Sequence, residues 1–96
     1  MKHFIVEITY TVPAEQLGDV TPVHRAFLQT GFDSGLLLFA GPQVPRVGGM
    51  VVARADSLEE IQQFFAEDPY QVQGLGTYRF IEFNPLKHQA FMEPWL

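Results

Sequence analysis

Apolar and polar residues alternate along two stretches of the chain, residues 3–11 near the start and "TYRFIEF" (77–83) near the end. Successive side chains of a strand point to opposite faces, so a period of two predicts a strand at each place. In the first stretch one face is apolar and the other is mixed. The apolar face carries Phe4, Val6, Ile8 and Tyr10.

A different spacing marks "TPVHRAFLQTGFDSG", in which apolar residues recur every three or four positions. Thr21 followed by Pro22 is typical of a helix start, with a hydroxyl cap and then a proline that needs no N–H partner. Gly31 and Gly35 predict the end of this helix within a few residues.

The second helix is predicted over "SLEEIQQFF". Ser57 and Glu60 have the S-x-x-E spacing of a capping box, in which each side chain accepts from the other residue's free backbone N–H. The stripe expected to be buried consists of Leu58, Ile61, Phe64 and Phe65.

Two further strands are predicted between the helices, at 36–40 and 49–55. The run "GLLLFAGP" is continuously apolar, as in a central strand buried on both faces, and "MVVARA" follows a turn-rich connector. The order is then β-α-β-β-α-β, which predicts a ferredoxin-like α+β fold with a four-stranded antiparallel sheet and both helices on one face.

No element of this order covers the second face of the sheet, where Ile5, Ile81 and Phe83 are expected. An apolar patch of that size is unusual on a monomer, so we expect a homodimer that pairs sheet face to sheet face. Residues 1–96 are expected to form a single domain with its core over 2–86. The aromatic tail 87–96 is expected to dock on something, a second subunit being one possibility.

The net charge of −5, with 11 acidic and 6 basic residues, excludes the basic surface that binding of nucleic acid or of anionic membranes requires. The absence of cysteine excludes disulfides, thiolate metal sites and cysteine nucleophiles. The start "MKHFIVEITYTV" does not resemble a signal peptide, and no apolar run approaches the ~20 residues of a membrane span. A cytoplasmic protein is expected.

Asp68 and His24 are the candidate chemical groups, and each allows two interpretations. Asp68 precedes a proline, as a helix cap does, and a capping carboxylate can also orient a histidine. His24 is expected in the first turn of its helix, where the positive end of the dipole favours a neutral imidazole that can accept a proton. Alternatively, His24 is a half-buried residue that packs beside Leu28.

Four segments taken in order, "VHRAFL", "GLLLFAGP", "GGMVVARADSLEEIQQFFAEDPY" and "GLGTYRFIEF", resemble the YCII-related (YciI-like) family over residues 2–86. The resemblance implies a dimeric α+β barrel. It also implies an active site that uses a first-helix histidine and the aspartate of a D-P-[FY] motif, which match His24 and Asp68. Gly41 and Pro42 match the family's G-P after the second strand. The segment "EQLGDVTP" and the tail after His88 depart from the pattern.

Other side chains are candidates for holding a substrate. Arg46 in the connector "QVPRVGG", and Arg25, can bind an anion. Tyr70 and Phe39 can line an aromatic-shaped pocket, and Ser34 is either a hydroxyl ligand or a turn residue. His3, His24 and His88 lack the spacing of metal ligands, and no phosphate-binding glycine motif occurs, so neither a metal nor a cofactor is expected.

These observations predict a YciI-like protein that binds a small molecule and uses His24 and Asp68 for cofactor-free proton transfer. The reaction expected is isomerisation or elimination on a small acidic or aromatic substrate. Two alternatives stay open, a non-catalytic metabolite-binding or regulatory homodimer, and a dimer in which the contact between His24 and Asp68 is purely structural.

Overall fold

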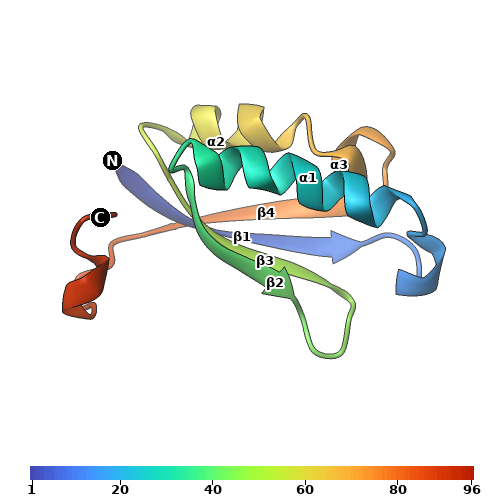
Figure 1. The fold of residues 1–96 in the computed structure, drawn as a ribbon, viewed down its shortest axis with the longest axis horizontal. Helices are drawn as coiled ribbons and strands as arrows, with labels where there is room; N and C mark the ends of the chain where they lie inside the picture. The colour runs from blue at the N-terminus through green and yellow to red at the C-terminus, as the bar shows by residue number, and fades with distance from the viewer.

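The computed structural model describes all 96 residues as one antiparallel sheet with its helices on one side (Figure 1). The strands follow the order β2-β3-β1-β4, and every neighbouring pair is antiparallel. This arrangement confirms the predicted ferredoxin-like fold. The elements are β1 (Lys2–Tyr10), η1 (Ala14–Gln16), α1 (Val20–Asp33), β2 (Leu37–Pro42), β3 (Gly48–Ala55), α2 (Leu58–Phe65), α3 (Pro69–Val72), β4 (Gly76–Phe83) and η2 (Ala90–Met92).

The core lies between the helices and the sheet. Phe4 and Val6 of β1 are fully buried, and so are Ile61 and Phe65 of α2. The period-2 pattern therefore predicted the buried face of β1 correctly. The helical pattern predicted the buried face of α2 except at Leu58, which is 41% exposed. Burial of one such side chain contributes about 1.5–3 kcal/mol, which is why these stripes determine how the elements stack. None of the helices is both long enough and apolar enough to cross a membrane.

The prediction that β2 is a central strand is wrong, because β2 lies at the edge of the sheet. Leu37 is opposite Ala53 and Phe39 is opposite Val52, so the register shifts by one residue between them. This bulge lets Leu37 point into the core while Phe39 stays 60% exposed on the other face. The run "LLLFA" therefore has apolar side chains on both faces of an edge strand. Leu37 packs under the helices, and Phe39 lies on the face that no helix covers.

The start of α2 agrees with the predicted cap in one half only. The Ser57 hydroxyl accepts from the Glu60 N–H at 3.1 Å. The Glu60 carboxylate accepts from the Asp56 N–H at 3.4 Å, one residue earlier than the capping box requires. Ser57 therefore caps the helix as predicted, and the return bond holds the residue before the cap.

The predicted start of α1 is wrong. The helix begins at Val20, and neither its preceding residue Asp19 nor Thr21 makes a side-chain capping bond. The Thr21 hydroxyl instead bonds the hydroxyl of Tyr70, 49 positions away, at 2.8 Å. Because the helix starts early, His24 belongs to its second turn, so the predicted influence of the helix dipole on the imidazole is weaker.

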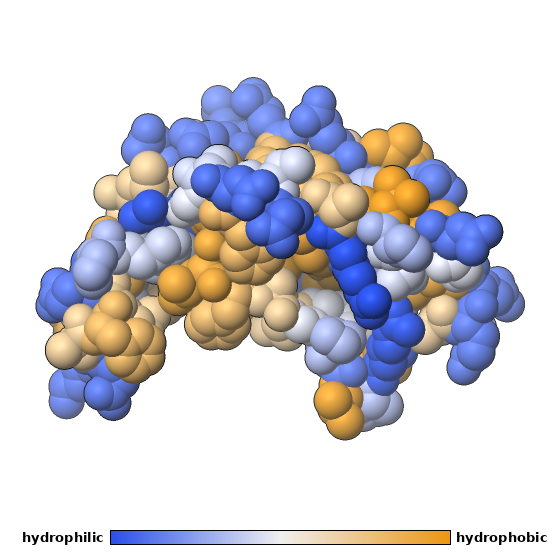
Figure 2. Space-filling view, in the orientation of Figure 1, coloured by the Kyte–Doolittle hydropathy of each residue, from blue (hydrophilic) through white to orange (hydrophobic).

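One face of the sheet has no helix over it, and we call its apolar part the open face. Ile5 lies opposite Val52 on one side and Ile81 on the other. Figure 2 shows this underside hollowed between two projections, the C-terminal segment at the left and the β2–β3 loop at the right. The residues of the open face are Ile5, Phe39, Met50, Val52, Ile81 and Phe83.

The tail beyond β4 is anchored to the sheet through Trp95. Its indole N–H donates to the Gly35 carbonyl at 3.2 Å, and the Arg54 guanidinium lies 5.2 Å from the ring centroid. Arg54 also donates to the Trp95 carbonyl. Phe91, by contrast, is 80% exposed. The expected docking of the tail is thus found for Trp95, on this chain's own sheet.

His3 lies under this tail, 9% exposed, with its ring centroid 5.5 Å from that of Trp95. Its Nε2 has no hydrogen-bond partner. Burial, followed by the N-terminal ammonium group and Arg54, holds the pKa of His3 below its ordinary 6.5. The unfolded chain therefore binds this proton more readily. Stability from neutral His3 is present above pH 6.5 and is lost as the pH falls below it.

We expect acidification below pH 6.5 to loosen the tail and to change the fluorescence of Trp95, the only tryptophan. His3→Leu should abolish this transition. His88→Gln is the matched control, because the bond to Glu93 raises the pKa of His88, the opposite direction. If the acid transition persists in His3→Leu, a group other than His3 causes it.

Candidate functional site

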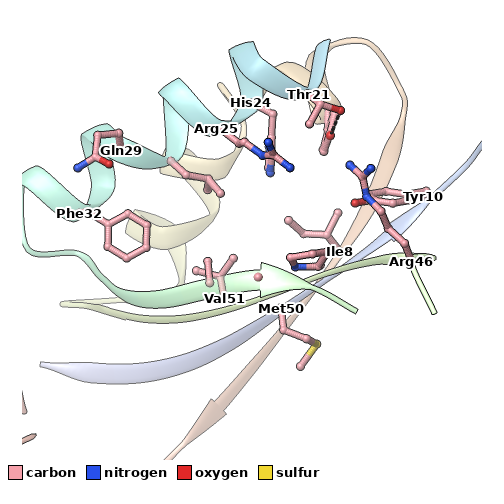
Figure 3. A pocket seen from close by; sticks show the side chains of 16 residues that line it. Ile8, Tyr10, Thr21, His24, Arg25, Gln29, Phe32, Arg46, Met50 and Val51 are labelled. Carbon is pink, nitrogen blue, oxygen red and sulfur yellow. Dashed lines mark hydrogen bonds between the residues drawn. The ribbon is translucent and has the colours of Figure 1, made fainter. Parts of the chain in front are cut away.

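A cavity of about 300 Å³ opens between α1 and the strand ends of β1, β2 and β3 (Figure 3). Its apolar lining comes from both layers. These residues are Ile8, Leu28, Phe32, Ala40 and Val51, while the side chain of Met50 points away from the cavity (Figure 3). Most of the polar side chains gather toward one end, and Gln29 lies at the other end near Phe32 (Figure 3). The gathered residues are Tyr10, Thr21, His24, Arg25, Arg46 and Tyr70. The cavity is of a size that holds a small organic molecule.

His24 and Asp68 meet at the wall of this cavity, although 44 positions separate them. The distance from His24 Nδ1 to Asp68 Oδ1 is 2.7 Å. His24 is 9% exposed and Asp68 is fully buried. Asp68 also caps α3, since Oδ1 accepts from the Tyr70 N–H at 3.1 Å. The two interpretations of Asp68, helix cap and partner of a histidine, therefore hold together.

A third donor completes the surroundings of Asp68. The Tyr78 hydroxyl donates to Oδ2 at 2.6 Å, so both carboxylate oxygens have partners. With the carboxylate as acceptor, the proton of a neutral His24 belongs on Nδ1. The lone pair is then on Nε2, the nitrogen that is free to meet a ligand. A histidine held in this tautomer is suited to act as a general base.

Tyr70 supports the imidazole instead of standing free in the cavity. Its ring stacks on that of His24, with centroids 4.0 Å apart and planes 14° from parallel. Only 1% of Tyr70 is exposed, and its hydroxyl is engaged by Thr21. The stack fixes the plane of the imidazole, and the bond to Thr21 ties α3 to α1.

Two guanidinium groups line the cavity, and no carboxylate does. Arg46, from the β2–β3 loop, lies with its guanidinium carbon 5.9 Å from the centroid of the Tyr10 ring. Hydrogen bonding to Tyr10 raises the pKa of Arg46, so it is positively charged at every relevant pH. Arg25 comes from α1, next to His24. The site therefore favours an anion, or an atom that becomes negative during a reaction.

Two of the sequence candidates lie outside the cavity. The Ser34 hydroxyl donates to the carbonyl of Gly31 at 3.1 Å, which makes Ser34 a residue of the turn that ends α1. Phe39 points to the open face because of the bulge in β2, so it cannot line a cavity under α1. Neither belongs to the site that we propose.

The sequence analysis missed three residues of the site. Alternation along β1 places Tyr10 on the same face as Ile8, and this signal could have found it. Thr21 and Tyr78 have no such local signal, because their partners lie 49 and 10 positions away. No group of three or more histidine, aspartate or glutamate side chains lies close enough together to hold a metal ion.

Known proteins share this sequence pattern. Protein YciI of Escherichia coli O6:H1 (strain CFT073) is 37% identical over 79 residues, which covers 71% of this chain and 78% of that protein. Protein YciI of Shigella flexneri matches to the same extent.

The fold recurs in a solved structure, 5-chloro-2-hydroxyhydroquinone dehydrochlorinase (TftG) from Burkholderia phenoliruptrix AC1100, in complex with 2,5-dihydroxybenzoquinone. The TM-score is 0.69 with 20% identity, over 93% of this chain and 97% of that one, so this likeness shows a shared fold. The YCII-related domain matches residues 1–84, which include both His24 and Asp68. This chain belongs to the YCII-related domain family.

Proposed function

We propose that this protein is a cofactor-independent enzyme that moves a proton on a small acidic or aromatic substrate, leading to isomerisation or elimination. The observation that carries the proposal is the buried 2.7 Å contact between His24 and Asp68 at the wall of the cavity. A carboxylate that orients an imidazole, with the far nitrogen beside an empty volume, is the arrangement that general base catalysis requires.

In the proposed reaction, Nε2 of His24 removes a proton from the substrate, and the electron pair of the broken bond moves toward a carbonyl oxygen. Arg46 or Arg25 stabilises the negative charge that develops there. For elimination, the electron pair then expels an anionic leaving group such as chloride. For isomerisation, the imidazolium returns its proton to a different carbon. Asp68 keeps its position in both cases and stabilises the imidazolium.

The substrate class is supported by the cavity and by the structural neighbour. The apolar lining between Ile8 and Phe32 suits a flat ring, and the two arginines suit a carboxylate or phenolate. The neighbour's name describes removal of chloride from a hydroxylated aromatic ring. A chlorinated hydroxyhydroquinone is therefore the first substrate to test, and 2,5-dihydroxybenzoquinone is the first ligand.

The alternative function is a non-catalytic homodimer that binds or senses a metabolite. Arg25 and Arg46 favour it, because two guanidinium groups can hold an anion whether or not a proton moves. Binding of 2,5-dihydroxybenzoquinone by the wild type, without chloride release from any chlorinated hydroxyhydroquinone supplied, would support this alternative.

We expect Arg46→Met to weaken binding of 2,5-dihydroxybenzoquinone roughly tenfold, which corresponds to about 1.4 kcal/mol, because the anion loses its charged partner. Isothermal titration calorimetry measures this change. The matched control is Arg79→Met. That variant removes the same charge from an exposed position opposite Glu7 on β1, outside the cavity. Absence of binding by the wild type, or equal loss in both variants, would contradict a binding role for Arg46.

The proposal includes a homodimer that pairs through the open face, and a cytoplasmic location as expected from the cysteine-free sequence. The open face supports pairing, because Phe39 is 60%, Met50 38% and Phe83 36% exposed on one side of the sheet. Side chains of this kind are removed from water when two sheets stack. Sedimentation equilibrium of the wild type measures the association directly.

A further inference from the structure

Tyr78 is a half-buried titratable group that the proposed reaction does not use. It comes from β4, while the two members of the pair come from α1 and the start of α3. We propose that Tyr78 is a positioning residue that controls how tightly the pair of His24 and Asp68 holds a proton. The inference rests on the proposed role of His24 as the base.

Tyr78 acts as a hydrogen-bond donor to the Asp68 carboxylate. Oδ1 receives two donors, His24 Nδ1 and the Tyr70 N–H, and Oδ2 receives the Tyr78 hydroxyl at 2.6 Å. Burial, together with the bond to Asp68, raises the pKa of Tyr78 far above its ordinary value. The hydroxyl therefore stays protonated and donates a hydrogen bond to the carboxylate.

Tyr78 packs against neighbouring aromatic rings, so its bond can hold the carboxylate in one orientation. Its ring lies 5.7 Å from that of Phe65 and 6.5 Å from that of Phe80, measured between centroids. Its backbone lies opposite Ile8 in the register of β1 and β4. A carboxylate gripped at Oδ2 keeps Oδ1 directed at the imidazole, and it cannot rotate when His24 takes up a proton.

The bond also weakens the pull of Asp68 on the imidazolium. A donor at Oδ2 draws negative charge away from Oδ1, which faces His24. The other polar groups near the imidazole are Tyr10, Arg25, Arg46 and Tyr70. None of their side chains bonds Oδ2. Tyr78 is thus the group that can change the proton affinity of the pair, and it acts from outside the cavity.

We expect Tyr78→Phe to raise the midpoint of the NMR titration of the His24 imidazole by about half a unit to one unit. The pair then holds its proton more tightly, because Asp68 has lost a competing donor. The resonance of the Nδ1 proton should move downfield as its bond to Asp68 strengthens. Thr11→Val is the matched control. It removes a hydroxyl that donates to the Gly74 carbonyl at 2.7 Å, at an exposed position outside the cavity, so both readouts should stay close to wild type.

An unchanged midpoint and an unchanged proton resonance in folded Tyr78→Phe would overturn the inference. If that variant fails to fold, tyrosine labelled with ¹³C at Cζ gives the same answer in the wild type. The chemical shift of Tyr78 Cζ should then change with pH at the same midpoint as the His24 imidazole. A Tyr78 chemical shift that does not change at that midpoint would overturn the inference. Neither readout needs turnover. A coupled pair without any activity would therefore contradict the proposed enzyme and leave the role of Tyr78 intact.

Discussion

Replacement of His24 by alanine is expected to lower turnover by about 10²–10⁴-fold, the usual contribution of a positioned general base. Affinity for a ligand such as 2,5-dihydroxybenzoquinone should change only a few-fold, since Arg46 and the apolar lining remain. The physical reason is that Nε2 is the free nitrogen at the wall of the cavity, while Nδ1 is occupied by Asp68. Steady-state rates of chloride release or of isomerisation, together with calorimetry, measure the two effects separately.

His88→Ala is the matched control, because it removes a histidine that bonds Glu93 in the tail and lines no part of the cavity. Its turnover should equal that of the wild type. Turnover that survives in His24→Ala would exclude His24 as the base. Binding and turnover lost together, with the fold intact, would show that the imidazole holds the ligand.

Replacement of Asp68 by alanine is expected to reduce the free energy of unfolding by roughly 3–5 kcal/mol, the cost of breaking a buried polar pair. Three donors lose their acceptor at once. They are His24 Nδ1, the Tyr70 N–H and the Tyr78 hydroxyl. Unmatched buried donors cost about 1–3 kcal/mol each when no water reaches them, and the cap of α3 is lost as well. Urea unfolding followed by circular dichroism measures the change.

Asp33→Ala tests whether the effect belongs to the buried site. Asp33 also accepts a side-chain bond, from Gln29 at 2.9 Å, but it is exposed. Its removal should change stability by about 0.5 kcal/mol or less. A loss below about 1 kcal/mol in Asp68→Ala would mean that water or a rearranged side chain satisfies the three donors.

Much of the fold follows from local patterns. Alternation along β1 and β4, the cap at Ser57 and, apart from the exposed Leu58, the helical stripe of α2 were predicted correctly, because each depends on residues a few positions apart. The edge position of β2 was not, because an apolar run looks the same whether helices or open space lie beside it. The start of α1 was predicted at Thr21 because a hydroxyl before Pro22 resembles a cap, while its true partner is the distant Tyr70.

In the candidate site, too, the sequence predicted local features and missed contacts between distant residues. The dipeptide of Asp68 and Pro69 indicated a cap, and the structure also brings Asp68 to His24. No local pattern revealed Tyr78, because its bond to Asp68 depends on the packing of β4 beneath α3. The prediction that Phe39 lines the cavity was wrong because of the bulge in β2. A single extra residue there turned the Phe39 side chain to the opposite face of the sheet.

The sheet separates two properties that many proteins build from the same residues. The pair of His24 and Asp68 lies on the helix side, and the open face with Ile5 and Ile81 lies on the other. Substitutions on one side can accumulate with little effect on the other. A duplicated copy of such a chain could acquire a different partner while it keeps its chemistry, or change its chemistry while it keeps its partner.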